Sequence, residues 1–238
     1  VIVLSGHLEY EHQSALEQLA LDTPSYQNQA ARRLAQAGHV TLTLGLRGFG
    51  VLGARSGNAH QLVAFNAIAA GSFLKAVHQR DIEDALTWLS LQPGIDPARI
   101  AVTGVSYGGE LAMQAAALDP RFAAVVYQGY MPTGPKRPEQ GDRLAPKPHY
   151  CHVVPGQRKV FTDEDLALML APRPALAVVG ALDHSVRDAL EGPGRVDRLS
   201  AGHRLLGAGD QIAFERGEGG HLYYVGPALD FLAQALSG

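Results

Sequence analysis

The feature that most constrains this chain is a serine set between glycines, at the point where an apolar stretch gives way to a helical one. Residues 100–103, Ile-Ala-Val-Thr, have the composition of a buried strand, and an alanine-rich helical run follows from Glu110 to Leu118. Between them lies Gly104-Val105-Ser106-Tyr107-Gly108, which is the pattern G-x-S-x-G. Between a strand and a helix, this pattern is typical of a nucleophile elbow, a sharp turn with a reactive serine at its apex.

The glycines of the motif are explained by the geometry of such a turn. Side chains two residues before and after the serine would collide with the neighbouring strand and helix, so Gly104 and Gly108 carry no Cβ. The Ser106 hydroxyl is then expected above the carboxyl end of the strand. The amide of Tyr107 is expected at a helix N-terminus, where it can stabilise a developing oxyanion. The alternative is a glycine-rich turn in which the serine only caps the helix.

Strand-like and helix-like segments alternate along the whole chain. Strands are expected at residues 1–4, 39–44, 100–103, 122–127, 175–179 and 211–215, and helices at 25–37 (capped by Ser25), 72–90, 110–118, 162–170 and 223–236. This alternation predicts an α/β fold with a mainly parallel sheet and helices on both faces. A chain of 238 residues fits a single domain of this kind, spanning residues 1–238. Residues 51–70 show no clear pattern.

Two further reactive residues directly follow expected strands. Asp183 comes after the strand at 175–179, and His221 comes after the strand at 211–215. Because the carboxyl ends of parallel strands share one edge of a sheet, these side chains should meet Ser106 there. A serine hydroxyl needs a base, and the base needs an orienting group. We therefore predict Ser106 as nucleophile, His221 as base and Asp183 as acid, with the backbone N–H groups of His7 and Tyr107 forming the oxyanion hole.

Other residues compete for two of these roles. His203 is the rival base, but it precedes the last strand instead of following it, and His184 directly adjoins Asp183. Asp188 and Asp210 are rival acids, but neither closes a strand. Position along the chain therefore favours His221 and Asp183.

The sequence predicts neither a metal site nor an organic cofactor. His149, Cys151 and His152 are too close together in the chain for one tetrahedral zinc site, and no second pair of ligands accompanies them. The chain has one cysteine, which excludes an internal disulfide.

Charge and hydropathy argue against several classes of partner. A formal net charge of −3 gives no reason to expect nucleic acid or an anionic membrane. No apolar run in the sequence approaches the ~20 residues of a transmembrane helix. The chain begins with Val1 instead of Met, so we expect further residues upstream, and the sequence does not indicate a cellular compartment.

Six motifs occur in an order that resembles the α/β-hydrolase superfamily. They are Ser5-Gly6-His7, Arg47-Gly48-Phe49-Gly50, the elbow at 104–109, Ala171-Pro172-Arg173-Pro174, Gly180-Ala181-Leu182-Asp183 and Gly220-His221. The chain is most similar to acetyl xylan esterase and dienelactone hydrolase-like serine esterases. The stretch from Cys151 to the Ala-Pro-Arg-Pro run resembles the acetyl xylan esterase branch most.

This resemblance implies the α/β-hydrolase fold and the same roles for Ser106, Asp183 and His221. It also implies a serine carboxylic ester hydrolase that acts through an acyl-enzyme, on acetyl or other short acyl esters of carbohydrates or small alcohols. Two alternatives stay open. One is a serine peptidase or lactone hydrolase with the same triad, and the other is a non-catalytic α/β-hydrolase scaffold.

The resemblance further implies two strands that this chain lacks. The family's sheet normally has two strands before the one at residues 1–4, and without them the strand at 39–44 is an unpaired edge. We expect upstream residues or a partner chain to cover that edge.

A long irregular segment at about residues 129–170 interrupts the alternation. Segments of this length between strands are usually functional, so we expect a lid-like insert. Its basic residues are typical of a solvated loop, or of a lid that favours anionic or carbohydrate-linked esters. They are Lys136, Arg137, Arg143, Lys147, Arg158 and Lys159.

Overall fold

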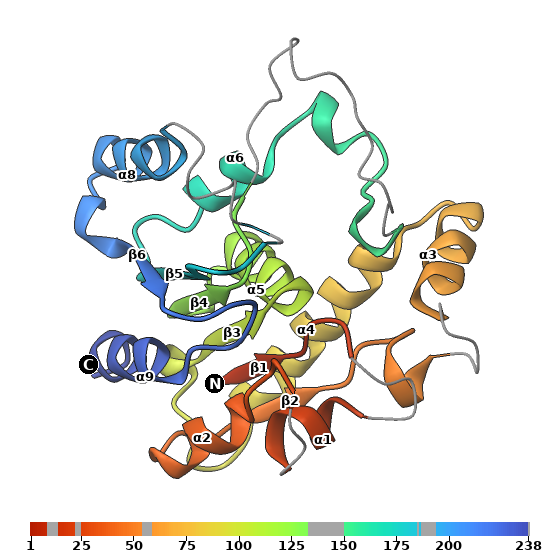
Figure 1. Ribbon diagram of the computed structural model, residues 1–238, viewed down its shortest axis with the longest axis horizontal. Coiled ribbons are helices and arrows are strands. Elements are labelled where there is room, and N and C mark those ends of the chain that lie inside the picture. Colours follow the sequence, from red (N-terminus) through yellow and green to blue (C-terminus); the bar gives the residue numbers. More distant parts are fainter. Residues whose placement is uncertain are drawn as a thin grey trace.

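A single parallel sheet runs through the middle of the computed structural model, with helices on both of its faces (Figure 1). The structure describes residues 1–8, 14–21, 25–53, 59–132, 150–184, 186 and 194–237. Within them the sheet has six strands, in the order β2-β1-β3-β4-β5-β6. The α/β architecture predicted from the alternating segments is confirmed.

The six strands are all parallel to one another and agree in position with the six expected ones. They are β1 (Ile2–Leu4), β2 (Leu42–Leu44), β3 (Ala101–Val105), β4 (Ala124–Gln128), β5 (Ala175–Gly180) and β6 (Ile212–Gly217). Strand β2 is shorter than the expected 39–44 and lies at an edge of the sheet. Its coverage by upstream residues or a partner chain stays a prediction.

The order of the strands marks where a ligand would bind. From β1 the chain passes to β2 on one side and then to β3 on the other. Such a reversal opens a crevice at the carboxyl ends of the two diverging strands, which is where open α/β sheets bind ligands. His7 follows β1 and Ser106 follows β3. Both residues therefore lie at this crevice.

The helices divide between the two faces of the sheet. Helices α1 (Ala15–Ala20), α2 (Ala30–Gln36) and α9 (Val225–Ala235) pack on one face (Figure 1). Helices α4 (Leu74–Ser90), α5 (Tyr107–Leu118), α6 (Asp163–Leu168) and α8 (Arg195–Leu205) pack on the other. Helix α3 (Ala59–Ala69) packs beside α4. The described residues also form short 3-10 helices: η1 (Gly50–Leu52), η2 (Pro97–Arg99), η4 (Tyr150–His152), η5 (Gln157–Lys159) and η6 (Gly209–Gln211).

Two apolar layers result, one on each face, and β1 shows how one strand serves both. Ile2 and Leu4 pack into the layer under α4 and α5, while Val1 and Val3 pack into the layer under α2 and α9. All four side chains are buried. A strand that is covered on both sides has no polar face, which explains its continuous apolar sequence.

Two local expectations need correction. The helix expected from Ser25 begins only at Ala30, because the Ser25 hydroxyl accepts the Gln27 N–H (3.2 Å) in a turn and Gln29 takes the N-cap position with φ 52°. The unassigned segment at 51–70 contains α3. Its sequence lacks a polar face, and large apolar side chains such as Phe65 are exposed (58%), so periodicity gave no signal. Among the described helices, none has the length and hydropathy to cross a bilayer.

Candidate active site

Ser106 stands at the apex of the turn between β3 and α5. Its backbone angles are φ 61° and ψ −124°, a conformation that residues with a side chain rarely adopt. Two main-chain hydrogen bonds hold it there: its N–H donates to the Gln128 carbonyl (2.8 Å), and its carbonyl accepts the Glu110 N–H (3.0 Å). The predicted strained turn at the serine is confirmed.

The two glycines of the motif lie where the main chains converge. A Cβ on Gly104 would be 2.5 Å from the carbonyl carbon of Gly108, and a Cβ on Gly108 would be 2.6 Å from the Ser5 carbonyl oxygen. Neither approach is possible for real atoms, because the clash is with backbone. Gly104 and Gly108 therefore let β3, α5 and the loop after β1 meet at Ser106.

The loop after β1 passes directly beside the serine. A Cβ on Gly6 would lie 2.9 Å from the Ser106 Cβ. The loop is fixed from its outer side: the Gly6 N–H donates to the Gln27 side chain (3.2 Å), and the Tyr26 hydroxyl donates to the His7 carbonyl. At the first residue of a helix, the Tyr107 N–H has no acceptor within the helix. The oxyanion-hole role of His7 and Tyr107 stays a prediction.

Asp183 and His221 are paired at the ends of β5 and β6. The His221 Nδ1–H donates to an Asp183 carboxylate oxygen at 2.7 Å. The Asp183 side chain is buried (1% exposed), whereas that of His221 is 29% exposed. Main-chain bonds join the two loops, from Ala181 N–H to Gly217 O (2.7 Å) and from Leu182 N–H to Gly219 O (2.9 Å). This contact leaves the other imidazole nitrogen, Nε2, as the one that can act as a base.

The His221 ring lies close to the segments that hold the elbow. A Cβ on Gly129 would be 3.0 Å from His221 Cε1 and 3.2 Å from Val105 Cγ2. The ring is also 5.3 Å from that of Tyr26, which binds the loop after β1. The residues predicted from three distant parts of the sequence thus lie at the carboxyl ends of β3, β5 and β6, and their joint catalytic role stays a prediction.

Gln128, a residue that the sequence did not single out, joins the elbow to the histidine loop. Its carbonyl accepts the Ser106 N–H, while its side chain accepts the Tyr224 N–H (2.7 Å) and donates to the Tyr224 carbonyl (3.0 Å). Tyr224 in turn donates from its hydroxyl to the Gly220 carbonyl (2.8 Å), next to His221. In the sequence, Gln128 is marked only by its place directly after an apolar run.

Three of the rival residues lie in the described structure. His203 is buried in α8, where its Nε2 donates to the Ala167 carbonyl (3.1 Å) and burial lowers its pKa. His184 and Asp210 are exposed, the latter in η6. Asp188 lies outside the described residues. In the described structure, the histidine bonded to Asp183 is therefore His221, not His203.

A buried group of charges lies behind the elbow. The Lys75 ammonium is 2.6 Å from one Glu110 oxygen, and the other oxygen accepts from His152 Nδ1. Burial alone would raise the pKa of Glu110, but Lys75 and His152 outweigh it and lower that pKa to about 2. The sequence did not predict these contacts, because Lys75 lies on the buried face of an otherwise amphipathic helix.

Histidine and aromatic side chains lie close to Cys151 and His7. His7 Nε2 is 3.4 Å from Cys151 Sγ, and the His7 ring lies 5.0 Å from His60 and 5.4 Å from Tyr107. Burial, and then the charge of Glu110, raises the pKa of the Cys151 thiol to about 12. A thiol with such a pKa is protonated near neutral pH and is not a nucleophile. His149 lies outside the described residues.

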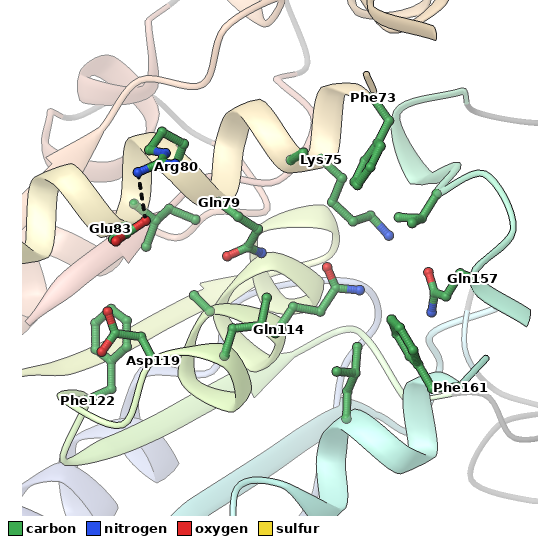
Figure 2. A pocket seen from close by; sticks show the side chains of 16 residues that line it. Phe73, Lys75, Gln79, Arg80, Glu83, Gln114, Asp119, Phe122, Gln157 and Phe161 are labelled. Carbon is green, nitrogen blue, oxygen red and sulfur yellow. Dashed lines mark ion pairs between the residues drawn. The ribbon is translucent and has the colours of Figure 1, made fainter. Parts of the chain in front are cut away.

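Figure 2 shows a cavity of about 430 Å³ between α4, α5 and residues 154–166. Phe73 and Phe161 face it together with the polar side chains of Gln114 and Gln157, and Lys75 reaches it from α4. Ser106, Asp183 and His221 do not line it. Because none of these three residues lines it, the cavity is distinct from the predicted catalytic group.

Part of the expected insert lies outside the described residues. Residues 133–149, which include Lys136, Arg137, Arg143 and Lys147, lie outside the described part, as does the side chain of Arg158. The expected helix at its end is confirmed as α6, with Thr162 as its cap. The lid-like character of residues 129–170 stays a prediction.

Comparison with known proteins agrees with this architecture. Residues 71–204, more than half of the chain, match the model of the Abhydrolase family (Abhydrolase_7). The chain is 27% identical over 209 residues to the "Putative hydrolase YtaP" of Bacillus subtilis (strain 168), a match that covers 84% of this chain and 64% of YtaP. The chain therefore spans less than two thirds of that relative.

Solved structures show the same fold. A "putative acetyl xylan esterase (BF1801)" from Bacteroides fragilis NCTC 9343 has a TM-score of 0.68 and 19% identity, over 90% of this chain and 58% of that one. A glucuronoyl esterase from Caldicellulosiruptor kristjansonii has a TM-score of 0.59 and 20% identity, over 99% of this chain and 68% of that one.

Proposed function

This chain belongs to the Abhydrolase family, and on that premise we propose that it is a serine hydrolase that cleaves carboxylic esters through an acyl-enzyme. The observation that carries the proposal is the strained Ser106 at the end of β3, with the His221–Asp183 pair at the ends of nearby strands. The chain order serine, aspartate, histidine is that of α/β-hydrolases.

In the proposed reaction the three side chains act in sequence. His221 Nε2 takes the hydroxyl proton as Ser106 Oγ attacks the ester carbonyl, and Asp183 holds the imidazole in the required tautomer through Nδ1. The negative oxygen of the tetrahedral intermediate accepts hydrogen bonds from the N–H groups of His7 and Tyr107. The protonated His221 then donates to the departing alcohol, and the acyl group stays on Ser106.

The second half of the reaction repeats these roles with water as nucleophile. His221 takes a proton from water, the hydroxide oxygen bonds to the acyl carbon, and the Ser106–acyl bond breaks. The carboxylic acid leaves and the serine regains its proton. For the substrate we propose an acetyl or other short acyl ester of a carbohydrate or small alcohol. This is supported by the resemblance to acetyl xylan esterase-like enzymes and by the names of the similar structures.

Labelling with a fluorophosphonate tests the proposal directly. Wild-type protein should be labelled at Ser106 and should hydrolyse p-nitrophenyl acetate faster than the octanoate. The Ser106→Ala and His221→Ala variants should lose both properties. Ser237→Ala, whose exposed hydroxyl bonds only locally to the Gln234 carbonyl, should behave as wild type.

Other outcomes would support the alternatives. Cleavage of peptide amides at a rate comparable to esters would indicate a peptidase, since amides need stronger protonation of the leaving group. Preference for lactones would indicate a lactone hydrolase. If folded wild-type protein is neither labelled nor active on any of these substrates, the chain is a non-catalytic scaffold.

A further inference from the structure

Three side chains from distant parts of the sequence converge beside the loop after β1. They are His7 after β1, His60 in the first turn of α3, and Cys151 in η4. Their ligand atoms, one imidazole nitrogen from each histidine and the cysteine sulfur, all lie within 4.8 Å of one another. We propose that these three side chains bind a divalent transition-metal ion such as Zn²⁺. This metal site is separate from the group proposed to hydrolyse esters.

The spacing suits a tetrahedral centre. With Zn–N of about 2.0–2.1 Å and Zn–S of about 2.3 Å, the nitrogen and sulfur of two ligands should be roughly 3.5 Å apart. The observed separation of His7 Nε2 and Cys151 Sγ is 3.4 Å. Since all three ligand atoms lie within 4.8 Å of one another, the remaining pairs need to close by at most about 1.4 Å, which rotations of the imidazoles supply.

The donor types also suit such an ion. One thiolate and two imidazoles form a borderline-soft set that zinc prefers over magnesium or calcium, which need oxygen ligands. Three protein ligands leave a fourth position for water or an anion. On binding, the metal–sulfur bond replaces the S–H bond, and the thiol proton passes to solvent.

Neighbouring contacts hold the three ligands in place. Phe49 stacks on the His60 ring (5.0 Å) and packs against the His7 ring (5.1 Å). The Tyr107 hydroxyl donates to the Cys151 carbonyl (3.1 Å). The N–H of the preceding residue, Tyr150, donates to Oε1 of Gln61 on α3 (2.7 Å). Contacts of this kind around a metal site orient the ligands and strengthen binding. An ion here would tie α3 and η4 to the loop that carries His7.

The test is a titration of untagged, chelator-treated wild-type protein with Co²⁺, followed by competition with Zn²⁺. Cys151 is the chain's one cysteine, so any thiolate-to-cobalt absorption in the near ultraviolet identifies it. We expect that band to saturate at about one equivalent of Co²⁺ and to disappear when Zn²⁺ displaces it. This readout needs no ester and no functional Ser106, so it should be the same in Ser106→Ala.

Variants assign the ligands. Cys151→Ser should lose the band, and His7→Gln and His60→Gln should each weaken Co²⁺ binding by at least about tenfold. The control is His152→Asn, because His152 is nearby (5.6 Å between its ring and that of His7) but bonds Glu110 instead; it should keep wild-type binding. Zn²⁺ should also slow alkylation of Cys151 in wild-type protein. This measurement uses no variant, so it does not depend on whether the substituted proteins fold.

Three results would each overturn the proposal. The first is wild-type protein that takes up Co²⁺ without a thiolate band, or takes up none. The second is Co²⁺ affinity in Cys151→Ser equal to that of wild type. The third is loss of Co²⁺ binding in His152→Asn but not in His60→Gln.

Discussion

Gln128 and Tyr224 exchange two hydrogen bonds, at 2.7 and 3.0 Å, between the side-chain amide of the glutamine and both main-chain groups of the tyrosine. The Gln128 carbonyl also accepts the Ser106 N–H. One residue thus fixes the elbow through its backbone and the segment after His221 through its side chain. The distance between nucleophile and base in the proposed mechanism depends on this link.

Replacing Gln128 with alanine should therefore lower kcat more than it raises KM. The substitution leaves the Tyr224 N–H and carbonyl without their partner and should cost roughly 1–3 kcal/mol of stability. Ester hydrolysis and urea unfolding, measured together, test both effects. Gln114→Ala is the matched control, because Gln114 is also buried but faces the cavity of Figure 2. Equal losses of kcat in the two variants would contradict the proposed link.

Gly180, at the end of β5, should tolerate no side chain. A Cβ there would overlap the Gly220 carbonyl oxygen and lie 2.5 Å from that of Gly219, in the loop that leads to His221. Gly180→Ala should therefore lower both Tm and activity, since the backbone must shift to relieve the clash. Gly226→Ala is the control: apart from its chain neighbours and the backbone of α9, nothing lies within 4 Å of its Cβ position, so it should cause no such clash and should keep activity. A Gly180→Ala protein that matches wild type in Tm and kcat would show that the loops are not held this closely.

Asp183→Asn should abolish most activity while leaving the fold intact. The amide is the same size as the carboxylate, but it can donate to Nδ1 and so favour the wrong tautomer of His221. In a triad with these roles, we expect kcat to fall about 10³–10⁴-fold with little change in KM. Steady-state kinetics on p-nitrophenyl acetate measure this, with Asp210→Asn, an exposed residue of η6, as the control. A loss of less than tenfold would remove Asp183 from the proposed triad.

The parts of the fold that could be predicted from the sequence are those set by local geometry. The G-x-S-x-G pattern fixes a turn because only glycine fits where β3, α5 and the loop after β1 meet. Asp183 and His221 could be paired in advance, because parallel strands bring their carboxyl ends to one edge. Both inferences use only the residues next to each motif in the sequence and the parallel direction of the strands.

The parts that could not be predicted depend on contacts between distant segments. Nothing near Gln128 in the sequence indicates that its side chain binds Tyr224, about a hundred residues later. Helix α3 lacks a polar face, so periodicity did not reveal it, and with it His60 was missed beside His7 and Cys151. Such groupings form only when the tertiary structure is complete.

The Lys75–Glu110 pair makes stability depend on pH in a defined direction. The pKa of folded Glu110 is lowered to about 2 from its ordinary value of 4.5, so the unfolded chain binds more protons between these values. The stability that Glu110 contributes is therefore complete above pH 4.5 and is lost progressively as the pH falls toward 2. Once Glu110 is protonated, the buried Lys75 ammonium loses its counter-charge.

Glu110→Gln should reproduce that loss at neutral pH. Removing one partner of a buried ion pair costs about 3–5 kcal/mol, so urea unfolding at pH 7 should show a deficit of this size. The deficit should shrink at pH 3, because Glu110 of the unfolded wild-type chain is then protonated while that of the folded protein is still mostly ionised, which lowers wild-type stability. The Lys75→Met/Glu110→Gln double variant should recover much of the loss. Glu83→Gln should change little at either pH, since its pair with Arg80 is exposed. A deficit for Glu110→Gln that stays constant from pH 7 to pH 3 would show that the charge of Glu110 does not stabilise the fold.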